Sequence, residues 1–146
     1  MGSPAHKTAR FRRTGESLGL SIESVPVRIR AVMRGFSYQA LVAFATNSGV
    51  GLSALAENLG IPERTLARRR AAGRLAPEES ERLLRLSSIF EKTVELFEGD
   101  VPTAVNWLST PKRALEGQPP LKYARTEVGA RQVENLIGRL EHGVFS

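Results

Sequence analysis

The sequence predicts an all-α fold. Apolar residues recur at intervals of three and four along several segments, and glycine and proline separate those segments. No segment shows a convincing strand pattern. The chain has 146 residues, of which 41% are hydrophobic and 25% charged. This length is enough for one compact domain, or for two small helical domains that share a core.

The first half is expected to hold a basic arm followed by four short helices. Residues 1–24 combine Gly, Ser and basic residues without a sustained period, which predicts a flexible arm. The ends of these helices are indicated by residue type: Pro26 suits a first turn, Ser37 suits a cap, and glycines follow each apolar run. We expect helices over about 26–34, 37–47, 52–59 and 62–72.

The second half begins with the longest expected helix, from Pro77 to about Phe97. Three glutamates in its first turn suit the positive end of the helix dipole, and we expect them on a solvated face. An apolar stripe follows, which is either intrachain core or a dimer seam: Leu83, Leu86, Phe90 and Phe97.

A shorter helix, a turn and a final helix complete the expected order. Asp100 caps a helix that carries Trp107, which we expect in the core. A short turn over residues 111–117 and a rigid connector over 118–120 lead to the last helix, which starts at Thr126 and ends at Gly143.

Composition argues against an enzyme, a cofactor and a metal site. The chain has no cysteine, and its two histidines, His6 and His142, lie far apart in the sequence. No carboxylate pair, Ser/His/Asp order or phosphate-binding glycine loop has the spacing that catalysis requires. No apolar run approaches the roughly 20 residues of a membrane span, and no signal peptide opens the chain, so we expect a cytoplasmic protein.

Positive charge is concentrated in the first half of the chain. The formal net charge is +6, made up of +5 over residues 1–40, +3 over 41–76, −3 over 77–99 and +1 over 100–146. Release of counterions from phosphates would favour binding of nucleic acid by this first half. Basic surfaces are common, however, and charge alone is weak support for that function.

The segment Leu52–Arg70 has the spacing of a helix-turn-helix of the phage-repressor and Xre type. Ala56 and Gly60 stand four residues apart, Ile61 lies in the turn, and Leu66 follows one helical turn later. The expected DNA-binding residues lie on the second helix, with Arg69 and Arg70 against phosphates and three residues facing the major groove: Arg64, Ala67 and Arg68.

A second interpretation of this segment stays open. An alanine-rich helical hairpin would show the same small residues, and its arginines would then form a solvated face. Arg69 also stands where such motifs usually bury an aliphatic residue. The helix-turn-helix could therefore serve as a scaffold without binding DNA.

Several segments, taken in order along the chain, resemble one known family. They are Arg64–Arg69, Gly73–Leu75, Glu78–Leu86, Ala104–Leu108, Pro111, Ala114–Gly117, Pro120–Leu121, Thr126–Ala130, Val133–Glu134 and Arg139–Phe145. Over about residues 26–146 the chain strongly resembles the Xre/MbcA/ParS antitoxins, which are partners of RES-domain toxins in type II toxin–antitoxin systems.

The resemblance implies that successive segments of the chain have different functions. Residues 25–76 would be an Xre/Cro-like helix-turn-helix domain that binds operator DNA, and 77–99 a connecting or dimerisation helix. Residues 100–146 would be a small helical toxin-binding domain. Such an antitoxin has no catalysis of its own. It covers the active site of a toxin that consumes NAD⁺ or transfers ADP-ribose from it, usually as a homodimer within a larger complex.

Carried over to this chain, the resemblance makes the C-terminus the expected toxin contact. Gly143, Val144, Phe145 and Ser146 would plug the toxin cleft, supported by Arg131 and Arg139 on the last helix. An apolar side chain at a chain end commonly finds a pocket on a partner. The alternative is that Phe145 folds back onto Trp107 and Leu140.

A different function also remains open at this stage. The chain could be a stand-alone transcriptional regulator whose second half only dimerises. The gene next to it would discriminate, because a RES-type neighbour would identify the partner.

Overall fold

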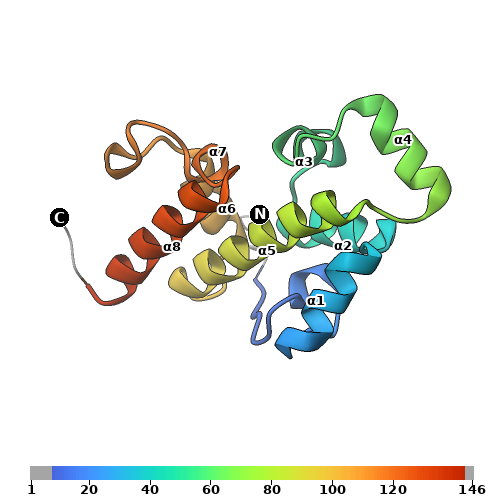
Figure 1. Cartoon of the computed structure of the whole chain (residues 1–146). Coiled ribbons are helices and arrows are strands. Elements are labelled where there is room, and N and C mark those ends of the chain that lie inside the picture. Colours follow the sequence, from blue (N-terminus) through green and yellow to red (C-terminus); the bar gives the residue numbers. More distant parts are fainter. Residues whose placement is uncertain (1–7, 144–146) are drawn as a thin grey trace, which may run out of the picture. The chain divides into compact units, whose positions relative to one another are not determined.

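The computed structural model describes residues 8–143 and confirms the all-α fold (Figure 1). Over those residues the only β pairing consists of isolated bridges. None of the described helices is both long and apolar enough to cross a bilayer. The α-helices are α1 (Val25–Arg34), α2 (Tyr38–Ser48), α3 (Leu52–Asn58), α4 (Glu63–Ala72), α5 (Pro77–Leu96), α6 (Val101–Ser109), α7 (Pro120–Tyr123) and α8 (Glu127–Glu141), with 3₁₀ turns η1 (Glu16–Leu18) and η2 (Arg113–Leu115).

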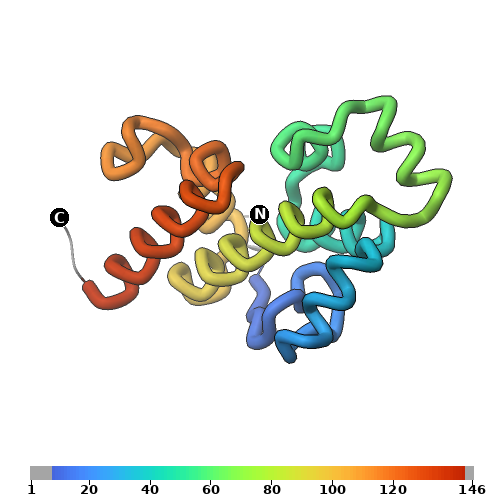
Figure 2. The backbone as a smooth tube through the Cα atoms, viewed as in Figure 1, coloured from blue at the N-terminus to red at the C-terminus, as the bar shows by residue number. Residues whose placement is uncertain are grey.

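The chain divides into two compact units. The N-terminal unit comprises residues 12–88, and the C-terminal unit comprises residues 8–11 and 89–143 of the described chain. Figure 2 traces the backbone of the N-terminal unit from η1 in blue, through the α3–α4 turn in green, into α5.

Residues 8–24 differ from the expected flexible arm. Leu18 and Ile22 are only 1% and 3% exposed, and η1 packs against α2. The side-chain amide of Asn47 donates to the carbonyl oxygen of Ser17 at 2.9 Å. Gly15 has a φ of 88°, and a Cβ there would overlap the side chain of Ile22. The prediction was wrong because a segment this short anchors through two apolar side chains that show no periodicity.

Helix ends follow local side-chain chemistry, as expected. Asp100 accepts a hydrogen bond from the backbone N–H of Thr103 at 3.1 Å, and Thr126 accepts one from Gly129 at 3.0 Å. Ser37 stands at the N-cap of α2, but its side chain makes no capping bond. The sequence did not predict α7, which extends the proline connector into a helix of four residues.

The apolar stripe of α5 is buried within the chain. Leu83, Leu86 and Phe90 are buried, together with Ile89 and Val94. Thr93 fills its place in the stripe by donating its hydroxyl to the carbonyl of Ile89 at 2.7 Å. Phe97, the fourth residue of the stripe, is only half-buried. Leu83, Leu86 and Phe90 are therefore intrachain core, and a role of α5 in dimerisation stays a prediction.

Two segments far apart in sequence meet in the C-terminal unit. The N–H of Ala9 donates to the carbonyl of Gly99 at 3.0 Å. Arg10 pairs with Glu95 at 2.9 Å, and the ring of Phe11 lies 5.5 Å from that of Phe90. The short N-terminal segment is thus attached to this unit, although Ala9 and Phe11 are only half-buried.

Candidate functional sites

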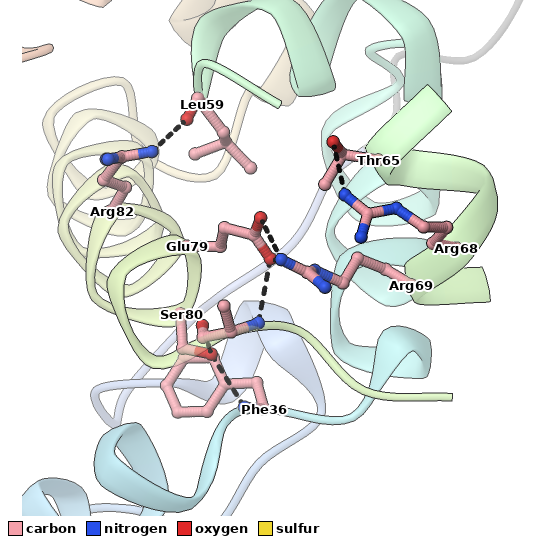
Figure 3. Close-up of polar contacts among 9 residues, drawn as sticks. Phe36, Leu59, Thr65, Arg68, Arg69, Glu79, Ser80 and Arg82 are labelled. Carbon is pink, nitrogen blue, oxygen red and sulfur yellow. Dashed lines mark hydrogen bonds and ion pairs between the residues drawn. The ribbon is translucent and has the colours of Figure 1, made fainter. Parts of the chain in front are cut away.

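The helix-turn-helix crossing is built as its spacing predicts. Leu55, Ala56 and Ile61 are buried, and Gly60 takes the turn with a φ of 70°. The N–H of Ile61 donates to the carbonyl of Ala56 at 2.8 Å. Arg82 of α5 donates to the carbonyl of Leu59 at 3.0 Å, which caps the end of α3 (Figure 3). α3 and its turn are therefore fixed by the body of the N-terminal unit.

α4 has no fully buried side chain, and a polar contact joins it to the start of α5. Nε and Nη2 of Arg69 donate to the two carboxylate oxygens of Glu79, at 2.8 and 3.2 Å. The two side chains are 26% and 10% exposed. Oε1 of Glu79 also accepts the backbone N–H of Ala76 at 2.8 Å. We call Arg69, Glu79 and the N–H of Ala76 the α4 clamp (Figure 3).

The clamp sets the ionisation of Glu79. Burial alone would raise the pKa of this carboxyl group, because it disfavours the charge. Hydrogen bonds from Arg69 and from the Ala76 N–H favour the carboxylate and outweigh burial, so the net effect is to lower the pKa of Glu79.

Arg69 and Glu79 therefore have different roles from those expected. Arg69 occupies the inward position that usually holds an aliphatic residue, and its guanidinium binds a carboxylate instead of facing outward. Glu79 is buried, although its helix start was expected to be a solvated face. The signal available in the sequence was the pairing of an arginine at a core position with a glutamate ten residues later.

The loop after α4 is tied to the start of α2 by backbone hydrogen bonds. Tyr38 N–H donates to the Gly73 carbonyl at 2.9 Å, and Leu75 N–H donates to the Phe36 carbonyl at 2.8 Å. A Cβ on Gly35, whose φ is 88°, would overlap the backbone oxygen of Leu75. This close approach fixes the loop that follows the C-terminal end of α4.

The other expected DNA-binding residues lie on the free face of α4. Arg64, Ala67, Arg68 and Arg70 are all exposed. Among the described residues none of these three arginines makes an ion pair; Arg68 donates only to the hydroxyl of Thr65 on its own helix, at 3.2 Å (Figure 3). Positions 64, 67, 68 and 71 share one side of a helix. We call this the α4 basic face.

In the C-terminal unit, α8 buries one side and exposes the other. Ala130, Val133, Leu136 and Ile137 are buried. A Cβ on Gly129 would overlap the carbonyl of Tyr123, so glycine allows α7 to approach α8 closely. Packing of the buried side of α8 therefore fixes which residues of the helix are exposed.

The exposed side of α8 brings the two expected arginines together with residues that the sequence interpretation missed. Arg131 and Arg139 are exposed, and Arg131 pairs with Glu127 at 3.3 Å. Val128 is 75% exposed. We call the set the α8 face: Val128, Arg131, Asn135, Arg139 and His142.

The α8 face leads directly to the end of the chain. Gly143 follows with a φ of 71°. The other three expected contact residues, Val144, Phe145 and Ser146, lie outside the described residues. Val128 could have been found from sequence as a valine on the polar side of the helical period.

Trp107 is less buried than a core residue. It is only partly covered, its ring centroid lies 6.4 Å from that of Phe97, and Nζ of Lys112 lies 4.8 Å from the Trp107 ring. Burial lowers the pKa of Lys112. The expectation of a core tryptophan was therefore wrong in part, because one side of the indole faces a cation.

Comparison with known families gives two matches that follow one another along the chain. Residues 27–88 match the model of the antitoxin Xre-like helix-turn-helix domain. Residues 92–143 match that of the antitoxin Xre/MbcA/ParS C-terminal toxin-binding domain.

Individual relatives agree with the family models. The chain is 39% identical to antitoxin Xre of Yersinia enterocolitica over 99% of this chain and 96% of that protein. It is 40% identical to antitoxin Xre of Photorhabdus laumondii over 60% of each chain, and 34% identical to antitoxin Xre of Pseudomonas putida over 57% of this chain and 52% of that protein. The chain therefore belongs to the Xre family of antitoxins, with a helix-turn-helix domain followed by a C-terminal toxin-binding domain.

Proposed function

We propose that this chain neutralises a cognate RES-domain toxin by covering the toxin's active site with the α8 face and the residues that follow it. The observation that carries the proposal is Val128, an apolar side chain that is 75% exposed between polar residues of the toxin-binding domain. Val128 supports the proposal because it lies on the same side of α8 as Arg131 and Arg139, and arginines are enriched at protein interfaces and suit a carboxylate-bearing partner.

The arrangement of the α8 face supports a plug at the end of the chain. Arg131, Asn135 and Arg139 line one side of α8, and His142 and Gly143 continue it towards residues 144–146. Because the inner side of α8 is packed, the backbone that carries these side chains is already ordered before binding. Less conformational entropy is then lost on binding, which favours high affinity. The last four residues would then enter the active-site cleft of the toxin: Gly143, Val144, Phe145 and Ser146. Because they would occupy that cleft, NAD⁺ could not bind there.

Copurification with the toxin tests this proposal. Tagged toxin expressed with the Val128→Asp variant should retain much less antitoxin than toxin expressed with the unmodified chain. Ala54→Asp, which adds the same charge at an exposed alanine of α3, should copurify normally. Equal recovery of the two variants would contradict a toxin contact at Val128.

We also propose that the antitoxin represses its own operon through the α4 basic face. Arg64 and Arg68 on this face, and the exposed Arg70 beside it, make no ion pair among the described residues, which favours contact with phosphates and base edges. The scaffold alternative rests on Arg69, whose position is now explained by the α4 clamp, so it loses its main support.

The remaining parts of the proposal follow from the family. The antitoxin would act in the cytoplasm without catalysis or cofactor of its own, as a homodimer within a larger complex. The alternative of a stand-alone regulator with a C-terminal dimerisation domain would be favoured if no RES-type gene lay beside this one.

A further inference from the structure

We propose that Arg30 and Arg34 of α1, with Arg74 of the loop after α4, form a second DNA contact that binds phosphates beside the α4 basic face. The inference rests on the operator binding proposed above and adds a surface to it. We call these three residues the flank arginines. They hold the duplex without reading its sequence, because phosphate contacts fix position and carry no sequence information.

The first observation is how the end of α1 is joined to the end of α4. Nη1 of Arg74 donates to the carbonyl of Gly35 at 2.6 Å, and Gly35 directly follows Arg34, the last residue of α1. The backbone bond from Leu75 to Phe36 holds the same two segments together. In Figure 1 the end of α1 lies beside the loop that joins α4 to α5. Arg34 and Arg74 therefore lie at one corner of the N-terminal unit, next to the C-terminal end of α4.

The second observation is that the flank arginines keep their charge for a ligand. All three are exposed, and none makes an ion pair among the described residues. α1 contains no acidic residue. Glu79, the buried carboxylate at the start of α5, is already bound by Arg69, and the exposed Glu78 makes no ion pair in the described part of the chain. The bond to Gly35 occupies one of the five N–H donors of Arg74, which leaves others for a phosphate oxygen.

The third observation is the spacing of the flank arginines. Arg30 and Arg34 stand four residues apart on one side of α1, which separates them by about 6 Å along the helix. The two phosphate backbones of B-DNA border a major groove about 12 Å wide, so a helix in that groove has phosphates on either side of it. Arg34 and Arg74 lie beside α4 at one of its ends, where such a backbone would pass.

A contact with a protein is the competing explanation of this corner. Ile29 and Met33, on the neighbouring side of α1, are 54% and 73% exposed. A second copy of the chain packed there would bring a second set of three arginines to the first, and like charges repel. A phosphate backbone neutralises the three charges instead, and it continues the contact proposed for the α4 basic face. The charge of the corner therefore favours DNA over a second copy.

The salt dependence of DNA binding tests the inference. We expect a flank variant, with Arg30→Gln, Arg34→Gln and Arg74→Gln, to bind at least about tenfold more weakly at physiological salt. The salt slope of log K should fall by about 3, because each lost charge means about one counterion fewer released from the DNA. The loss should be of the same size for the operator and for a non-operator duplex of equal length. Arg113→Gln with Lys122→Gln, which removes two exposed cations of the C-terminal unit, should change neither affinity nor slope.

The preference for the operator over the other duplex separates this inference from the proposed function. Arg64→Ala with Arg68→Ala should lower that preference, because these residues would contact base edges, whereas the flank variant should leave it unchanged. An unmodified chain that shows no preference would contradict operator binding, and a chain that binds neither duplex would overturn both proposals.

Three results would overturn the inference while operator binding stands. They are an unchanged affinity of the flank variant, weaker binding with an unchanged salt slope, as loss of a self-contact would cause, and an altered preference for the operator. Circular dichroism checks that the variants fold. Arg30→Gln with Arg34→Gln, which keeps the bond from Arg74 to Gly35, should still lower the slope by about 2 and serves if the triple variant unfolds.

Discussion

Arg69 and Glu79 form a two-point ion pair, with N–O distances of 2.8 and 3.2 Å, that joins α4, the second helix of the helix-turn-helix, to the first turn of α5. Because α4 buries none of its side chains fully, this pair contributes to its position as an aliphatic residue does in other helix-turn-helix proteins. The arginine that breaks the usual pattern is therefore a component of the fold.

Removing Glu79 should destabilise the N-terminal unit. Glu79→Ala leaves the guanidinium of Arg69 and the N–H of Ala76 without their acceptor, which costs about 1–3 kcal/mol for a partly exposed pair. Urea denaturation measures the loss. Glu78→Ala, at an exposed position beside it, should change the free energy of unfolding by less than about 0.5 kcal/mol. Equal effects of the two changes would argue against the clamp.

The clamp also predicts a dependence of stability on pH. The pKa of Glu79 is lower in the folded chain than the ordinary value of about 4.3, so the folded state binds this proton less readily than the unfolded state. Its contribution is present above that ordinary value and is lost as the pH falls through the lowered folded pKa. The difference in melting temperature between the unmodified chain and Glu79→Gln should shrink over that range. A constant difference would show that the carboxylate is not involved.

Two glycines of α8 should respond in opposite directions to alanine. Gly129→Ala would drive a methyl group into the carbonyl of Tyr123 and should lower the free energy of unfolding by about 1–3 kcal/mol. Apart from its chain neighbours and the adjoining backbone of α8, no atom lies within 4 Å of where a Cβ on Gly138 would lie, so Gly138→Ala should raise stability by about 0.5–1 kcal/mol. Thermal unfolding separates them, and a shift of the same sign for both would refute the close packing of α7 on α8.

The α4 basic face predicts a particular change in DNA binding. Arg64→Ala with Arg68→Ala should weaken binding to the operator and reduce the salt slope of log K by about 2, because each lost positive charge in the groove means about one counterion fewer released from the DNA. Arg113→Ala, at an exposed arginine of the C-terminal unit, should leave the slope unchanged. Fluorescence anisotropy over a salt series measures both, and an unaltered slope in the double variant would support the scaffold alternative.

Much of the fold could be predicted because local rules decide it. Asp100 and Thr126 cap helices as their residue type suggests, and Gly60 takes the turn that its spacing requires. Leu18 and Ile22 escaped prediction because their burial depends on α2, which no short-range pattern reveals.

The candidate functional residues likewise fall into those that local sequence predicts and those that depend on tertiary contacts. The outward position of Arg64 and Arg68 follows from helical periodicity, which sequence supplies. The inward bond of Arg69 depends on where Glu79 lies in space, and the exposure of Val128 depends on which side of α8 is packed. Such properties come from tertiary contacts that a single sequence does not report.

Inhibition of the toxin tests the central claim most directly. NAD⁺ consumption by the cognate RES-domain toxin should be titrated with the full chain, with a chain that ends at His142, and with Arg131→Glu combined with Arg139→Glu. The account predicts that the full chain abolishes consumption at a fixed stoichiometry, whereas the other two fail to do so while still folding and binding operator DNA. Complete inhibition by the shortened chain and by the α8 variant at that same stoichiometry would contradict it.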